Sequence, residues 1–270
     1  MNWSLAYDNS RAVAGSEHFL AQWQATAETF RQRQHASARL DLRYGEHARQ
    51  AYDLFLPADG HARALLVHVH GGYWMRTDKS CWSHCAAGAL AHGLAVAIPS
   101  YRLCPEVSVA SITSDVSRAI EAAGRRVDGP IVLSGHSAGG HLVTRQLCND
   151  TTLDAATRSR VCAALSISGL HDLRPLIKTA MNDTLQLSTP TARAESPALL
   201  EPRADTHLYA WVGADELPEL RRQTALLKLM WQGQLDTADA TEAPGKHHFD
   251  VIDALEDPQS GMLQTLLAHC

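Results

Sequence analysis

The stretch from residue 131 to residue 143, IVLSGHSAGGHLV, limits the possible folds more than any other part of the chain. It opens with a short apolar run, 131–133, that predicts a buried β-strand. The residues from Gly135 to Gly139 match the pattern G-x-S-x-G, and a helix is expected to begin directly after them. In such an elbow the chain turns so sharply that the serine backbone is strained and its hydroxyl group is exposed. We therefore expect Ser137 to be a nucleophile; the alternative is a glycine-rich turn that only connects two elements.

A nucleophile of this kind needs amide donors for the negative oxygen of its intermediate. The amide of Ala138 lies at the expected helix N-terminus, where it has no partner within the helix. A second group of donors is expected after the apolar run 64–69, where Gly71 and Gly72 precede Tyr73. Because glycine has no Cβ, the chain can turn an amide inward there without a steric cost. We therefore expect these four residues to form an oxyanion hole.

Composition narrows the class of protein. The chain has 270 residues, 45% of them hydrophobic and 20% charged, which is usual for a single globular α/β domain. The formal net charge of -5 offers no basic surface for nucleic acid or an anionic membrane, so we expect a small-molecule substrate. No stretch approaches the ~20 apolar residues of a membrane span, and the first residues lack the features of a signal peptide. Six cysteines without a C-x-x-C pair are expected to be reduced, and these features predict a soluble cytoplasmic protein.

Hydrophobic periodicity predicts that strands alternate with helices over most of the chain. Expected strands are 40–44, 50–56, 64–69, 94–98, 131–133, 161–167, 207–212 and, more weakly, 237–240; expected helices are 16–33, 78–92, 109–125, 141–149, 218–231, 251–255 and 262–267. The first two strands are expected to pair antiparallel, because a short turn separates them. The alternation that follows is typical of a parallel sheet with both faces covered. The predicted fold class is α/β, with a mostly parallel central sheet and helices on both faces.

Two segments depart from this alternation within the single domain expected for 1–270. The N-terminal helical segment, 1–35, is expected to be irregular over 1–14 and then helical, with Ser16 as the cap. Its apolar stripe is expected to pack against the body rather than to contact substrate. The proline-containing stretch 172–205 is expected to form a small cap over the carboxyl ends of the strands, where it shapes the substrate pocket. The alternative is a plain long connection.

Serine needs a base to take its proton, and the base needs an acid to orient it. In hydrolases with an elbow of this kind, the three groups follow one another as Ser, Asp or Glu, and His. After Ser137 the chain offers Asp215 or Glu216 behind a predicted strand, and His247 or His248 in a loop near the end. Each pair lies just beyond the carboxyl end of a strand, which is where a catalytic triad requires it.

A metal site must be weighed at His68 and His70, which stand two residues apart on a predicted strand and so share one face. No third ligand lies nearby in a recognisable pattern. We therefore expect structural roles for both histidines, no metal ion and no other cofactor.

Several motifs together resemble the arylformamidase (kynurenine formamidase) branch of the esterase/lipase α/β-hydrolases. They are HGGYW at His70–Trp74, DKS at Asp78–Ser80, GHSAGGHL at Gly135–Leu142, DLRP at Asp172–Pro175 with Asn182-Asp183, and His248-Phe249. The similarity extends over essentially the whole chain. It implies an α/β-hydrolase fold with a serine nucleophile.

The resemblance also bears on which acid and which histidine belong to the triad. The family places its acid at G-x-x-[DE], which corresponds to Glu216, and its histidine directly before a phenylalanine, which corresponds to His248. Leu220 departs from the aromatic residue that the family has at that position. We therefore expect the triad to be Ser137, Glu216 and His248.

The resemblance implies hydrolysis of an N-formyl arylamine, such as N-formyl-L-kynurenine, to kynurenine and formate in tryptophan catabolism. Trp74 is expected to contact the aryl group, although Tyr73 and Trp74 could instead serve only in packing. One alternative is a carboxylesterase for small acyl or aryl esters. Another is a non-catalytic binding module, against which the intact set of Ser, acid and His argues. The sequence does not decide the oligomeric state and leaves a homodimer open.

Overall fold

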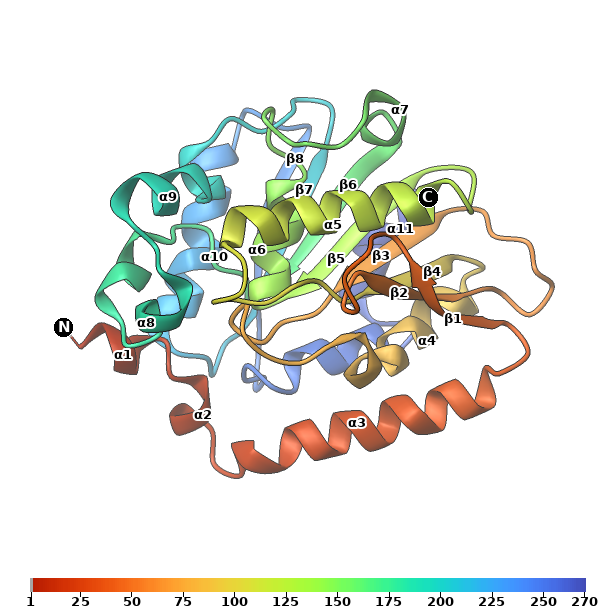
Figure 1. The fold of residues 1–270 in the computed structure, drawn as a ribbon, viewed down its shortest axis with the longest axis horizontal. Helices are drawn as coiled ribbons and strands as arrows, with labels where there is room; N and C mark the ends of the chain where they lie inside the picture. The colour runs from red at the N-terminus through yellow and green to blue at the C-terminus, as the bar shows by residue number, and fades with distance from the viewer. Residues whose placement is uncertain (1) are drawn as a thin grey trace.

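An eight-stranded sheet forms the centre of the computed structural model, which describes residues 2–270. The strands are β1 Ala38–Arg43, β2 Ala51–Phe55, β3 Leu65–Val69, β4 Ala95–Pro99, β5 Ile131–His136, β6 Val161–Ile167, β7 His207–Gly213 and β8 Thr237–Ala243. Their order across the sheet is β1-β2-β4-β3-β5-β6-β7-β8 (Figure 1). β1, β2 and β4 pair antiparallel, and every pair from β4 to β8 is parallel. The predicted mostly parallel α/β fold is confirmed.

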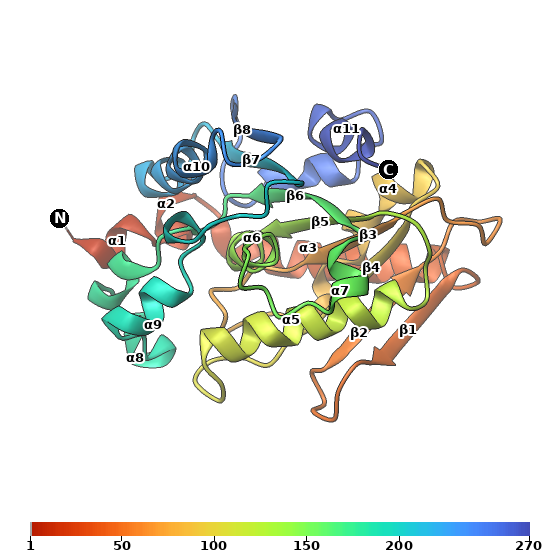
Figure 2. The same ribbon diagram turned by 90° about the horizontal axis from the view of Figure 1, so that it is seen from above.

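Helices cover both faces of this sheet, and Figure 2 shows α5 and α11 on opposite sides of it. One face packs against α5 Val109–Gly124, α6 Ala138–Arg145 and α10 Pro218–Trp231; the other packs against α3 Ser16–Arg33, α4 Ala87–Ala91 and α11 Gly261–Leu267. The residues of β3 do not alternate between apolar and polar, because both faces of this strand are buried. Leu65 and Val67 belong to one core cluster, whereas Leu66 between them belongs to the other.

The region after β3 differs from the predicted helix 78–92. Two 3₁₀ turns, η1 Lys79–Cys81 and η2 Ser83–Ala86, precede the short α4. Asp78 does cap this region, since its carboxylate accepts from the Ser80 amide at 2.8 Å. However, Arg31 of α3 donates to the Ser80 carbonyl and to Ser83 Oγ. The Ser80 carbonyl thus bonds to a distant side chain, and a continuous helix is not formed.

The N-terminal segment is more regular than predicted for 1–14, of which residue 1 lies outside the described residues. It forms two short helices, α1 Trp3–Ala6 and α2 Asn9–Ala12, whose caps are the side chains of Asn2 and Asp8. α3 begins at Ser16 as predicted, but its cap is Gly15 in the left-handed region at φ +74°, without a capping side chain. In Figure 1 this red segment runs along one side of the molecule to the start of α3.

The segment 172–205 forms short elements without a sheet of their own. They are η3 Arg174–Lys178, α8 Asn182–Leu185, α9 Thr189–Ala194 and η4 Pro197–Leu199. These elements lie beside α1 and α10. The C-terminal part of the chain adds η5 Val251–Leu255, a 3₁₀ turn where a helix was predicted. None of the helices formed by residues 2–270 is long and apolar enough to span a membrane.

Candidate active site

The elbow at the end of β5 holds Ser137 in a strained conformation, with φ 56° and ψ −119°. Its two glycines are sterically required. A Cβ on Gly135 would lie 2.2 Å from the Gly139 carbonyl oxygen, and a Cβ on Gly139 would lie 1.9 Å from the Val69 carbonyl oxygen. The neighbouring strand secures the turn, because the Ser137 amide donates to the Ile167 carbonyl at 2.8 Å.

A buried carboxylate lies directly against the histidine after β8. Glu216 Oε2 is 2.7 Å from His248 Nδ1, while Glu216 Oε1 accepts from the Gly213 amide at 2.8 Å and from Ser168 Oγ. Burial by itself would raise the pKa of Glu216, but the attraction of His248 and these hydrogen bonds outweigh it and lower the pKa below its usual value. Glu216 is therefore an ionised acceptor that can orient the imidazole.

The two other candidates at these positions lie elsewhere. Asp215 is exposed; its main-chain amide donates to the Lys246 carbonyl at 3.0 Å, and its carboxylate forms no hydrogen bond within residues 2–270. His247 directs Nδ1 to the Asp250 carboxylate at 3.0 Å. The structure thus brings Glu216 and His248 together, and not the residues that precede them.

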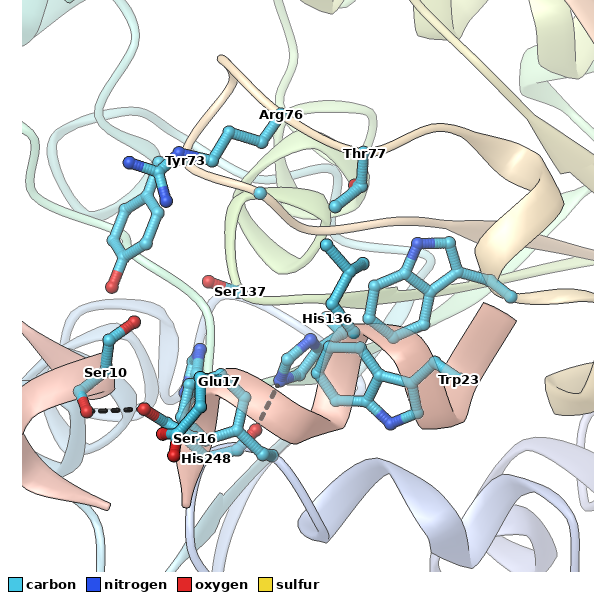
Figure 3. A pocket seen from close by; sticks show the side chains of 14 residues that line it. Ser10, Ser16, Glu17, Trp23, Tyr73, Arg76, Thr77, His136, Ser137 and His248 are labelled. Atoms are coloured by element: carbon cyan, nitrogen blue, oxygen red, sulfur yellow. Dashed lines mark hydrogen bonds between the residues drawn. The ribbon is translucent and has the colours of Figure 1, made fainter. Parts of the chain in front are cut away.

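His248 and Ser137 line one cavity, as Figure 3 shows. With Nδ1 of His248 held by Glu216, its Nε2 is left for the cavity side, where the base of a serine hydrolase acts.

His136, between the first glycine and the serine of the elbow, also supports this histidine. Its Nε2 lies 2.9 Å from the His248 carbonyl oxygen, and the two rings are 4.6 Å apart. Burial, together with His248, lowers the pKa of His136 well below its usual value, so the ring is neutral and donates through Nε2. The sequence contains no signal for this contact, because His136 holds a main-chain atom 112 residues away.

The glycine-rich loop after β3 passes close to the nucleophile. A Cβ on Gly71 would lie 3.1 Å from the Ser137 Cβ, and Gly72 has φ +112°. The Gly72 carbonyl accepts from the Arg76 amide at 2.9 Å, which closes the turn. Within residues 2–270, the amides of Gly72, Tyr73 and Ala138 have no acceptor. They are thus available to an oxygen bound beside Ser137.

Tyr73 carries backbone strain, with φ +54°, and is held from the N-terminal segment. Its hydroxyl donates to the Tyr7 carbonyl at 2.9 Å and accepts from Asn9 Nδ2 at 3.2 Å. These contacts fix the loop that carries two of the free amides.

Trp74 does not lie where a substrate contact requires it. Its side chain is completely buried, and its Nε1 donates to His141 Nδ1 at 3.2 Å. It does not line the cavity that holds Ser137. The expected contact with the aryl group is therefore wrong, and Trp74 packs beneath the loop.

His68 and His70 lie beneath the same loop. His68 Nδ1 is 2.8 Å from Ser134 Oγ, and His70 stacks on Tyr101 with ring centroids 4.3 Å apart. Burial lowers the pKa of His68 to about 3 and that of His70 to about 4, so both rings are neutral. Across residues 2–270, no three His, Cys, Asp or Glu side chains gather as a metal site would require.

The cavity at Ser137 has a volume of about 240 Å³. Its walls come from the N-terminal segment, the loop after β3, the elbow and the loop after β8; they are Ser10, Ser16, Glu17, Leu20, Trp23, Gly72, Tyr73, Arg76, Thr77, Trp82, His136, Ser137, His248 and Phe249. None of these residues belongs to 172–205; from this segment, Ala180 and Met181 line only an adjoining hollow that shares Ser10, Tyr73 and Arg76 with the cavity. The segment expected only to pack, 1–35, contributes Ser10, Ser16, Glu17, Leu20 and Trp23 to the wall. Trp23 does both, since it lines the cavity and contacts Trp82 with ring centroids 4.6 Å apart.

A family model described as BD-FAE matches residues 52–202, which is more than half of the chain. The chain belongs to the BD-FAE family. Among the relatives of this BD-FAE protein, the kynurenine formamidase of Salmo salar is 26% identical over 88% of this chain and 84% of its own. That of Drosophila melanogaster is 27% identical over 80% of this chain and 77% of its own. The resemblance to the arylformamidase branch is thereby confirmed.

Solved structures agree on the fold. A crystal structure described as a putative thioesterase from Silicibacter sp. TM1040 is 45% identical, with 99% of each chain covered and a TM-score of 0.94. An esterase from Pyrobaculum calidifontis, at 18% identity, covers 94% of this chain and 92% of its own with a TM-score of 0.70, which shows the fold alone. The BD-FAE protein is thus a hydrolase with the α/β-hydrolase fold.

Proposed function

We propose that this BD-FAE protein is a serine hydrolase that releases formate from an N-formyl arylamine such as N-formyl-L-kynurenine. The observation that supports this substrate is the similarity to kynurenine formamidases from three animals over 80–88% of this chain. The Glu216–His248 pair beside the cavity of Ser137 supports the reaction type.

In the proposed reaction, Ser137 Oγ attacks the formyl carbon while His248 Nε2 takes the hydroxyl proton. Glu216 holds the other ring nitrogen, which fixes the tautomer and stabilises the imidazolium ion that forms. His248 then donates the proton to the departing aryl amine. Water hydrolyses the formyl ester by the same steps in reverse and releases formate.

The negative oxygen of each intermediate binds the amides of Ala138 and of the Gly72–Tyr73 turn. One such donor contributes about 3–4 kcal/mol in enzymes where it has been removed. The donors are held before substrate arrives, because Ala138 begins α6 and the contacts of Tyr73 with the N-terminal segment hold the turn. Preorganised donors act on the transition state without a cost of reorganisation.

A formyl carbon carries only hydrogen and needs no acyl pocket beyond the oxyanion hole. An esterase for longer acids would gain about 0.8 kcal/mol for each methylene group that an apolar slot buries. We therefore expect kcat/KM for phenyl esters to fall from acetyl to hexanoyl, with N-formyl-L-kynurenine cleaved faster than any of them. Rates that rise with chain length, without formamide cleavage, would make the protein a carboxylesterase.

Two controls complete this test. Phenyl thioacetate belongs in the series because the 45% identical structure is described as a putative thioesterase; a preference for it over the formamide would refute the proposal. A serine-directed phosphonate should label Ser137. If the protein showed neither labelling nor turnover, it would be a non-catalytic binding module.

A further inference from the structure

The cavity at Ser137 has two chemically different sides. Trp23, Trp82, Leu20 and Phe249 form an apolar wall, while Arg76, Glu17, Ser10 and Ser16 supply charged and polar groups. Figure 3 shows Trp23 on one side of Ser137, with the guanidinium group of Arg76 and the side chain of Ser10 on the other. A substrate that fills this cavity therefore combines an apolar part with a charged part.

Arg76 brings a guanidinium group to the edge of the cavity. The side chain is exposed and forms no hydrogen bond or ion pair within residues 2–270. Its main chain is well held, because its amide donates to the Gly72 carbonyl at 2.9 Å. A guanidinium group is a planar double donor that matches a carboxylate. Arg76 is thus a cation on a fixed loop, three residues from an oxyanion-hole amide.

Glu17 faces the same cavity from the first turn of α3. Among residues 2–270, the one basic side chain within 4 Å of its carboxylate is that of His18, at 3.4 Å, and both side chains are largely exposed. An exposed pair of this kind contributes little energy, so the Glu17 carboxylate is available to a ligand. Arg76 and Glu17 line the same cavity without forming an ion pair with each other, so neither charge neutralises the other.

A second hollow of about 230 Å³ adjoins this side. It shares Ser10, Tyr73 and Arg76 with the cavity at Ser137, and Asp8 lines it without forming an ion pair with Arg76. A side chain that extends from an aryl ring at Ser137 therefore has room next to the guanidinium group.

We propose that Arg76 and Glu17 form a subsite for the α-amino acid group of an aromatic substrate. Arg76 binds the carboxylate and Glu17 binds the ammonium group, while the aryl ring lies against the apolar wall. The substrate of the proposed formamidase carries such an amino acid group, so the subsite rests on the proposed function. It makes Arg76 and Glu17 specificity-determining residues outside the triad.

Three formamides test the subsite with purified full-length protein. N-formyl-L-kynurenine carries both charges, 4-(2-formamidophenyl)-4-oxobutanoate carries only the carboxylate, and 2-formamidoacetophenone carries neither. Arg76→Gln should raise KM about tenfold for the first two and less than threefold for the third. A tenfold change corresponds to about 1.4 kcal/mol. Glu17→Gln should raise KM about fivefold for N-formyl-L-kynurenine alone, with kcat little changed in every case, because these contacts bind the ground state and the transition state equally.

The matched control is Arg193→Gln. Arg193 is also exposed and unpaired within residues 2–270, but it lies in α9 of the 172–205 segment, away from the cavity. Its KM values should stay within twofold of the wild type. If Arg76→Gln lowers kcat for all three substrates alike, Arg76 only supports the oxyanion loop and the subsite is refuted. Equal sensitivity of Arg76→Gln and Arg193→Gln would also refute it.

The subsite can be tested even if no formamide is cleaved. The wild type should then hydrolyse 3-acetoxybenzoate with a lower KM than phenyl acetate, and Arg76→Gln should abolish that difference. This outcome would refute the formamidase function but support the anion site. No difference in the wild type, with no effect of Arg76→Gln, would refute the anion site.

Discussion

Replacing Glu216 by glutamine keeps the size of the side chain and removes its charge. The structure predicts how the new amide would sit. Ser168 Oγ and the Gly213 amide both donate to Oε1, so the carbonyl oxygen of the glutamine would remain there. Its NH₂ group would then face His248 Nδ1, which is 2.7 Å from Oε2 in the wild type.

An NH₂ group at this place needs an acceptor, so it would favour the tautomer of His248 with the proton on Nε2. That tautomer cannot take the proton of Ser137. The variant would also lose the negative charge that stabilises the imidazolium ion. By analogy with the same change in a well-studied triad, we expect kcat to fall on the order of 10⁴-fold, which corresponds to about 5 kcal/mol.

The measurement is kcat for a phenyl ester and for N-formyl-L-kynurenine, with the unfolding temperature as a check on the fold. Asp215→Asn is the matched control, since Asp215 is adjacent, acidic and exposed, and its kcat should change less than about threefold. A larger loss for Asp215→Asn than for Glu216→Gln would refute the assignment of the acid. So would a Glu216→Gln variant that retains a tenth of the wild-type kcat.

The remaining predictions concern the nucleophile, the elbow and acid stability. Ser137→Ala should abolish turnover and phosphonate labelling while the unfolding temperature stays near that of the wild type; retained activity would exclude Ser137 as nucleophile. Gly139→Ala should lower the unfolding temperature by about 5 °C or more, because its Cβ would lie 1.9 Å from the Val69 carbonyl oxygen and the main chain must shift; an unchanged temperature would contradict the close packing. The lowered pKa of Glu216 means that its ionised form stabilises the fold above the pKa of about 4.3 of an unfolded glutamate, and that this stability is lost as the pH falls through the folded pKa. Chemical denaturation from pH 7 to pH 3 should therefore show the advantage of the wild type over Glu216→Gln shrinking below about pH 4; an advantage that grows toward low pH would reverse the sign.

Local pattern determined the framework of this protein. β6 and α10 begin and end at the predicted residues, because the hydrophobic pattern within each of these segments is enough to predict it. The elbow was predictable for the same reason, because its steric requirements act over five consecutive residues. In the site, the carboxylate that reaches the histidine is the one that the family resemblance indicated.

Tertiary structure decided the surroundings of the nucleophile. Arg31 binds the Ser80 carbonyl in the region where two 3₁₀ turns and a short helix replace the helix predicted over 78–92, and His136 holds the main chain of His248. The N-terminal segment forms part of the cavity wall, although the insertion at 172–205 was the more plausible contributor from its position in the chain. Each of these features depends on a contact between residues far apart in the sequence. Periodicity describes which face of an element is buried, but not which distant segment covers it, so only the packed chain determines what a substrate meets at Ser137.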